Sequence, residues 1–291
     1  MSNPRTAPST PSGPARPRLT CIGLAALAAC VLAPWAHADE GDASLGIDRA
    51  VTLPAQAQGN PPVWAGKAFR QGVVSVANPY AAEAGATMLE QGGNAIDAAV
   101  AIAYALNVVE PQSAGIGGGF MMIHLARTGQ TFFIDTREKA PAGATPGMFV
   151  GVTRPDLNGV AVGVPGMVRG TELALQRWGN LSLAQTLQPA IELADAGFAA
   201  TPRYAAVSCN ARSQNSPEAA AVFCPGGGNV GPVVGSLVQN KPLAATLRQI
   251  ATHGADCFYK VMPEKGCDIA LGIVEGQKLT DRRPPMARAA A

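Results

Sequence analysis

The most constraining feature of this sequence is a glycine-rich run, Ala114–Gly119, that joins a predicted helix to a predicted β-hairpin. Asn94 is a suitable helix N-cap with Asp97 in capping-box position, and apolar residues follow with helical spacing. After the glycines, two apolar stretches, 120–125 and 131–134, flank a polar turn and predict antiparallel strands. A helix followed closely by a hairpin indicates an α/β fold of the α+β kind.

Other elements follow from capping and breaking signals. Helices are predicted over residues 80–90, 167–178, 182–196, 243–253 and 268–275, and short strands over 72–77 and 160–164. Residues 201–235 are predicted to be loop. The buried face of the helix after Asn94 is predicted to contain Ile96, Ala99, Val100, Ala103 and Leu106.

The N-terminus has the organisation of a signal peptide. Arginines without acidic residues precede the apolar run 19–33, and an Ala-x-Ala site ends at Ala38. We expect cleavage after Ala38, so residues 1–38 are the signal peptide and the protein is periplasmic or secreted. A less favoured alternative is a lipoprotein acylated at Cys30. Residues 39–71, rich in Gly, Ala, Pro and Gln, are predicted to be a linker.

Charge and hydropathy exclude two classes of partner. Removal of residues 1–38 takes away three arginines and no acidic residue, and changes the formal net charge from +2 to −1. Because no excess of basic residues is left, we expect no nucleic-acid partner. No other segment is a long enough apolar run to predict a membrane span.

Four cysteines remain after the signal peptide, and an even number in an exported chain favours disulfides. Three pairings are possible. We predict Cys209 with Cys224 and Cys257 with Cys267, because each pair closes a short local loop.

Common catalytic motifs are missing from the sequence. There is no H-E-x-x-H zinc helix and no G-x-S-x-G elbow, and the glycine run lacks the G-x-G-x-x-G and G-K-[ST] patterns of nucleotide sites. A helix also precedes this run, whereas a phosphate loop precedes one. We therefore predict no metal and no cofactor, and interpret the glycines as allowing close approach of the backbone to packed helices or to a substrate.

Arg137 is the candidate binding residue. It follows the second hairpin strand and precedes Pro141, so its guanidinium is a well-placed bidentate fork for a carboxylate. The alternative is that Arg137 only forms an ion pair with Asp135 or Glu138.

Several segments together resemble the large-subunit region of the γ-glutamyltransferase (glutathione hydrolase) family. They occur in the family's order and cover roughly residues 72–260. The segments are Val74–Gly85, Gln91–Val100, Val109–Phe120, Asp135–Pro141, Val162–Gly166, Pro189–Ala194 and Phe258–Tyr259.

The resemblance implies a truncated part of an N-terminal nucleophile hydrolase fold, an αββα sandwich. Family members transfer or hydrolyse the γ-glutamyl group of compounds such as glutathione through a threonine acyl-enzyme. By position, Arg137 would hold the α-carboxylate of that group. The nucleophilic threonine of the small subunit has no counterpart in this sequence, so no catalytic residue is assigned.

We therefore predict a large-subunit-like domain over residues 72–275 and an atypical Arg/Pro/Ala tail over 276–291, which a frameshift or a truncation would explain. The chain is expected to be inactive unless a threonine-bearing chain joins it. Two alternatives stay open: a non-catalytic carboxylate-binding or scaffold protein, and a related acylase acting on β-lactam side chains.

Overall fold

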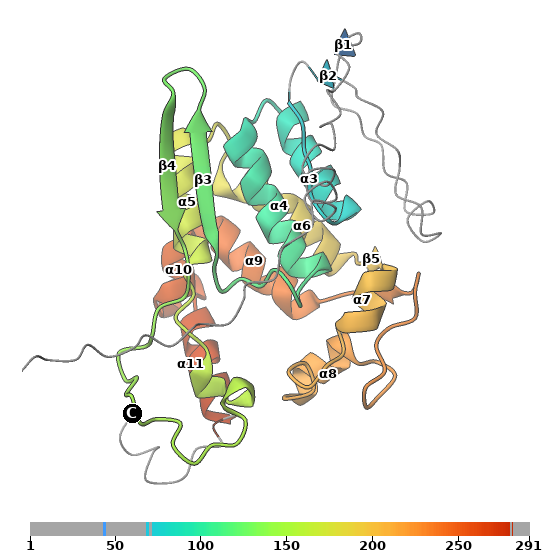
Figure 1. Cartoon of the computed structure of the whole chain (residues 1–291), viewed down its shortest axis with the longest axis vertical. Helices are drawn as coiled ribbons and strands as arrows, with labels where there is room; N and C mark the ends of the chain where they lie inside the picture. The colour runs from blue at the N-terminus through green and yellow to red at the C-terminus, as the bar shows by residue number, and fades with distance from the viewer. Residues whose placement is uncertain (1–42, 45–67, 70–71, 280, 282–291) are drawn as a thin grey trace, which may run out of the picture. The chain divides into compact units, whose positions relative to one another are not determined.

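A computed structural model of the chain describes residues 43–44, 68–69, 72–279 and 281 (Figure 1). The predicted signal peptide, including Cys30, lies outside the described residues. Of the predicted linker the structure describes two short parallel strands, β1 (Ala43–Ser44) and β2 (Ala68–Phe69). The predicted tail is described only at 276–279 and 281.

Two consecutive helices, α3 (Pro79–Glu90) and α4 (Ala95–Val109), pack against each other. Asn78 caps α3, and Asn94 forms the predicted capping box with Asp97. The buried residues between the helices are Ala81, Ala84, Met88, Ala98, Ala101 and Ala105. Five of these six are alanines, whose small side chains let the two backbones approach closely, as the alanine content predicts.

The predicted buried face of α4 is only partly right, because Ile96, Ala103 and Leu106 are half-buried against the core. Of its five positions only Val100 is fully buried, and Ala99 is exposed. The helix is apolar on nearly every side, so spacing alone could not select the buried positions. The structure buries two faces, with alanines toward α3 and Val100, Tyr104 and Val108 in the main core.

The predicted hairpin is confirmed. Strands β3 (Phe120–Leu125) and β4 (Gln130–Asp135) are antiparallel, with Phe120 opposite Asp135. Strand β4 packs on helix α5 (Met167–Trp178) (Figure 1). At this contact the ring centroids of Phe132 and Trp178 lie 5.0 Å apart. The outward hairpin face, which we define as Phe120, Met122 and Phe133, is 62–69% exposed.

Two predicted strands are wrong. Residues 72–77 alternate in burial as a strand would, but they form no ladder within the described part of the chain. Gly159–Ala161 is a 3-10 helix, and Val164 makes only an isolated bridge with Lys139. Alternation predicts which side chains are buried, whereas a strand also requires a neighbour for its backbone hydrogen bonds.

The main core includes helix α6 (Leu183–Asp195), which contacts both α4 and α9 (Lys241–His253). The carboxylate of Asp97 is buried and accepts hydrogen bonds from the backbone N–H groups of Asn94, Asn180 and Leu181. These bonds tie the first turn of α4 to the segment that leads into α6.

The C-terminal elements are α10 (Ala255–Tyr259), a 3-10 helix at Pro263–Lys265 and α11 (Ile269–Leu279). Another 3-10 helix, at Pro155–Leu157, lies between β4 and α5 in the sequence. Helix α11 confirms the helix predicted over 268–275 and continues through Leu279, into the region predicted to be tail.

The segment 201–235 is more ordered than predicted, because it contains helices α7 (Pro202–Val207) and α8 (Pro217–Phe223). Strands β5 (Phe198–Ala199) and β6 (Leu237–Val238) pair at its ends. Both predicted disulfides, Cys209–Cys224 and Cys257–Cys267, are present.

Candidate functional site

Arg137 lies two residues beyond the end of β4, where the sequence predicts it. Its side chain is 67% exposed, whereas the preceding residue, Thr136, is buried. The backbone N–H of Arg137 donates to the Asp135 carboxylate over 2.9 Å. The strand end therefore fixes the backbone of Arg137 and leaves its guanidinium available to a ligand.

Glycines surround the backbone that carries Arg137. A Cβ on Gly118 would overlap the carbonyl oxygen of Thr136, and a Cβ on Gly170 would overlap the Thr136 side chain. A Cβ on Gly166 would lie 2.5 Å from the Thr136 carbonyl oxygen. We call these three residues, with Thr136, the glycine seat. The glycine run does allow a close backbone approach at Gly118, but its neighbour is the segment after β4 and not a packed helix or a substrate.

Backbone hydrogen bonds hold the same segment from both sides. Thr136 exchanges two bonds with Gly119, of 2.9 and 3.2 Å, which prolong the hairpin ladder. Lys139 exchanges two bonds with Val164, of 3.1 and 2.8 Å. The segment that carries Arg137 is therefore hydrogen-bonded to the start of the hairpin on one side and to the chain before α5 on the other.

Arg137 also forms the ion pair that the alternative interpretation predicts. Its Nη2 lies 3.3 Å from Oε2 of Glu138, while Asp135 binds the backbone N–H instead. An exposed pair of this kind contributes about 0–1 kcal/mol, so a ligand carboxylate that binds in two places can compete with it. The ion pair and a binding role for Arg137 are compatible.

An open depression of about 370 Å³ adjoins Arg137, and we call it the Arg137 depression. Its lining carries three cationic side chains, Arg137, Lys139 and Arg169, and one acidic side chain, Asp135. The other lining residues are Ile134, Val164, Pro165, Gly166, Gly170, Leu173 and Tyr259. This balance of charge favours an anionic ligand.

A larger depression, of about 460 Å³, lies along α6 and α9. Its lining includes Ile191 and Glu192 of the Pro189–Ala194 segment but no residue of Asp135–Pro141 or Val162–Gly166. Its charged lining residues are Glu192, Asp195 and Arg248, so it has no excess of positive charge. Size alone would favour this depression, but charge and motif residues place the candidate site at the smaller one.

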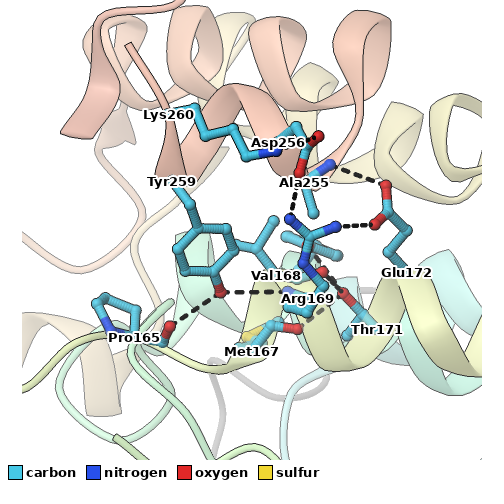
Figure 2. A network of polar contacts seen from close by, with 11 residues as sticks. Pro165, Met167, Val168, Arg169, Thr171, Glu172, Ala255, Asp256, Tyr259 and Lys260 are labelled. Atoms are coloured by element: carbon cyan, nitrogen blue, oxygen red, sulfur yellow. Dashed lines mark hydrogen bonds and ion pairs between the residues drawn. The ribbon is translucent and has the colours of Figure 1, made fainter. Parts of the chain in front are cut away.

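Polar contacts join α5 to α10 (Figure 2), and two of the residues involved, Arg169 and Tyr259, line the Arg137 depression. The Arg169 guanidinium pairs with Glu172 and Asp256, and Lys260 also pairs with Asp256. Hydrogen bonds from Lys260 and then from Arg169 lower the pKa of Asp256 to about 2. Burial raises the pKa of Tyr259, and the backbone N–H of Arg169 partly offsets this effect.

Sequence reasoning missed the roles of Arg169 and Tyr259. In the sequence, Tyr259 stands out only because Phe258–Tyr259 is one of the segments that resemble the family. No local pattern marks Arg169 as its partner. The two residues are 90 positions apart, so only the fold brings them together.

The described residues contain no group of three or more potential metal ligands among His, Cys, Asp and Glu. His124 is exposed on β3, with Nδ1 3.0 Å from the Thr131 hydroxyl, and it does not line the Arg137 depression. Across the same described segments, no helix has both the length and the apolar character needed to cross a bilayer.

Comparison with known proteins gives consistent results. Residues 81–266 match the family model described as Gamma-glutamyltranspeptidase. The chain is 44% identical over 200 residues to a glutathione hydrolase proenzyme of Bacillus subtilis (strain 168), a match covering 66% of this chain and 34% of that protein. It is 42% identical over 204 residues to the acylase ACY 1 proenzyme of Pseudomonas sp. (strain SE83), covering 65% of this chain and 36% of that protein.

Among solved structures, gamma-glutamyltranspeptidase of Helicobacter pylori is similar with a TM-score of 0.66 and 39% sequence identity, covering 73% of this chain and 61% of that one. The transpeptidase CapD of Bacillus anthracis is similar with a TM-score of 0.58 and 31% identity, covering 71% of this chain and 65% of that one. The chain spans about a third of the length of the curated relatives.

Proposed function

Because this chain belongs to the gamma-glutamyltranspeptidase family, we propose that it forms the carboxylate-binding part of an enzyme that transfers or hydrolyses γ-glutamyl groups. Its described part has a mixed helix and strand architecture of the α+β class, as part of an N-terminal nucleophile hydrolase fold. Compounds such as glutathione are the proposed substrates.

In this proposal the Arg137 guanidinium binds the α-carboxylate of the γ-glutamyl group. The observation that carries it is a 67% exposed arginine on a backbone that glycines and hydrogen bonds hold in place. A planar guanidinium can donate two parallel hydrogen bonds to one carboxylate, which fixes the orientation of the substrate as well as its position.

The nucleophile in this proposal is a threonine of a small-subunit polypeptide. Its hydroxyl attacks the γ-amide carbonyl while its own amine takes the proton, and a tetrahedral intermediate forms. The C–N bond of that intermediate then breaks, the leaving amine takes the proton and departs, and the acyl-enzyme is left. Water or an acceptor amine then takes the acyl group and releases the threonine. Arg137 holds the substrate at one end and does not take part in bond making.

The outward hairpin face supports a second polypeptide as partner. Phe120 and Phe133 lie with ring centroids 5.4 Å apart on a face that no described segment covers. The proposed location, periplasmic or secreted, rests on the charge and hydropathy of residues 1–38 alone.

An acylase acting on β-lactam side chains is the second candidate. The 42% identity to the acylase ACY 1 proenzyme favours it, and so does a similar fold in cephalosporin acylase from Bacillus halodurans, with a TM-score of 0.54 and 31% identity. The two candidates differ in substrate, since the first acts on γ-glutamyl compounds and the second on the acyl side chain of a β-lactam.

Isothermal titration calorimetry of the chain with L-glutamate tests the first candidate. We expect saturable binding that weakens at least about tenfold in Arg137→Ala, because charged hydrogen bonds contribute roughly 1.5–3 kcal/mol. Arg137→Lys keeps the positive charge but loses the two parallel donors of the guanidinium, so its affinity for L-glutamate should lie between those of wild type and Arg137→Ala.

Arg154→Ala is the matched control, because Arg154 also pairs with an acidic neighbour, Asp156, and does not line the Arg137 depression. Absence of binding to the wild-type chain, or equal losses in Arg137→Ala and Arg154→Ala, would contradict the proposal. Binding of a β-lactam acyl side chain in preference to glutamate would favour the acylase.

A further inference from the structure

Helix α5 lacks a capping side chain of its own. At the start of α3, α4, α6 and α9, the N-cap side chain accepts a backbone N–H bond, and the N-caps are Asn78, Asn94, Ser182 and Asn240. The N-cap of α5 is Gly166, which has no side chain to offer. Because first-turn amides have no partner within a helix, those of α5 need partners from elsewhere.

The glycine seat explains why a capping residue is missing. A Cβ at Gly166 would lie 2.5 Å from the carbonyl oxygen of Thr136 and 3.0 Å from that of Arg137. Serine, threonine or asparagine at this position would therefore displace the backbone that carries Arg137. The N-cap position of α5 must therefore be glycine, because any side chain there would collide with the backbone that carries Arg137.

Tyr259 supplies the missing contact from another element. The backbone N–H of Arg169, in the first turn of α5, donates to the Tyr259 hydroxyl over 3.2 Å. That hydroxyl donates in turn to the carbonyl oxygen of Pro165 over 2.9 Å (Figure 2). One phenol thus bridges the helix start and the residue before Gly166.

Contacts around α10 determine where this phenol lies. The Arg169 guanidinium lies 5.4 Å from the centre of the Tyr259 ring and pairs with Asp256. The backbone N–H of Ala255 donates to Glu172 of α5 over 2.9 Å. The buried Cys257–Cys267 disulfide joins α10 to the following segment.

We propose that Tyr259 is a positioning residue for the carboxylate site: its hydroxyl replaces the missing N-cap of α5 and so holds the Pro165–Gly166 bend against the backbone of Arg137. The inference rests on the proposed function, because Arg137 is taken to bind the substrate. Tyr259 acts through α5 and the bend, not through the guanidinium itself.

Tyr259→Phe tests the inference, with Tyr80→Phe as a matched control. The Tyr80 hydroxyl also makes two backbone hydrogen bonds, both with one residue, since it accepts from the N–H of Ala199 over 2.9 Å and donates to the carbonyl of Ala199 over 3.4 Å. Tyr80 does not line the Arg137 depression. Phenylalanine keeps the ring at both positions, so both variants should fold.

Two measurements are made on wild type and both variants: L-glutamate affinity by calorimetry, and hydrogen exchange at the Lys139 amide, which is bonded to Val164. We expect Tyr259→Phe to weaken glutamate binding about three- to tenfold, the effect of one lost hydrogen bond, and to speed exchange at Lys139. Tyr80→Phe should change neither.

If wild type binds glutamate and the two variants bind equally well, the positioning role is wrong while the proposed function stands. If wild type does not bind glutamate, the proposed function fails. Hydrogen exchange at the Lys139 amide then tests whether Tyr259 holds the backbone of Arg137 in place. Faster exchange at Lys139 in Tyr259→Phe alone supports the link from Tyr259 to the Arg137 backbone, and equal exchange in all three proteins overturns it.

Discussion

At the scale of single residues, the glycines around Thr136 act through space and not through backbone conformation. Gly118, Gly166 and Gly170 are not among the glycines with positive φ, so an alanine could adopt their backbone angles. What excludes a larger residue is contact with Thr136. Because Gly166 and Gly170 have no side chains, the backbone at Thr136 and Arg137 lies closer to the start of α5 than it could if side chains stood between them.

Gly170 provides a prediction with an unusual sign. In a helix interior, alanine is normally favoured over glycine by about 1 kcal/mol. Gly170→Ala in α5 should instead destabilise the chain by roughly 1–3 kcal/mol, because its Cβ would overlap the Thr136 side chain. Urea unfolding measures the difference.

Gly272→Ala in α11 is the matched control, since a Cβ there meets nothing within 4 Å. It should stabilise the chain or leave it unchanged. Stabilisation by both substitutions would show that the seat can relax around Thr136.

The site was only partly predictable from its residues. Arg137 could be found because a strand pattern, an arginine and Pro141 are adjacent in the sequence. Tyr259 could not, because its role depends on a glycine at position 166 that leaves an amide unpaired, and on an α10 whose placement is set by distant contacts. Local patterns carry no information about such a partner.

At the scale of elements, local capping explains most of what the sequence predicted correctly. Helices that begin at Asn94 and Ser182 carry their start signals within three residues, and both capping boxes are present. The short helices α7 and α8 were missed although Thr201 and Ser216 cap them and a proline follows each. The predicted strands at 72–77 and 160–164 failed because pairing depends on a neighbour, which no local pattern reveals.

The contact between α5 and α10 predicts a pH dependence. An Asp256 pKa of about 2 lies below the ordinary value of about 3.9, so its ion pairs stabilise the fold above pH 4. That stabilisation is lost as the pH falls from about 4 to about 2. The urea midpoint of Asp256→Asn should therefore lie below that of wild type at pH 6 and converge with it near pH 2.

Because Asp256 is exposed, high salt should also reduce the difference at pH 6. A difference that persists unchanged at pH 2 would mean that the substitution acts through packing and not through charge.

At the scale of the whole molecule, the apolar residues of the hairpin are divided between two surfaces. Phe132 packs on Trp178, whereas Phe120, Met122 and Phe133 are exposed together. Contiguous exposed apolar surface is typical of interfaces and of regions prone to association. The chain spans about a third of its curated relatives, and the outward hairpin face is where we propose that further polypeptide binds.

We expect the chain by itself to associate through this face. The double variant Phe120→Thr/Phe133→Thr should shift the chain toward the monomer in size-exclusion chromatography, with little change in its thermal midpoint. Threonine keeps strand propensity, so the hairpin should remain.

Val230→Thr/Val233→Thr is the matched control, because both valines are exposed in a loop away from the hairpin strands. A monomeric wild-type chain with a sharp, cooperative melt would contradict the prediction.

The distance in sequence between Arg169 and Tyr259 also has a consequence for synthesis. The two residues are 90 positions apart, so at roughly 5–20 residues per second the phenol is made about 5–18 s after the amide that it caps. During that interval the nascent chain already contains the hairpin, Arg137 and α5, but not the hydroxyl that bridges Pro165 and Arg169. The hydrogen bonds of Tyr259 that hold the bend beside Arg137 can therefore form only after α10 has left the ribosome. A nascent chain that stalls before residue 259 would contain Arg137 without these bonds.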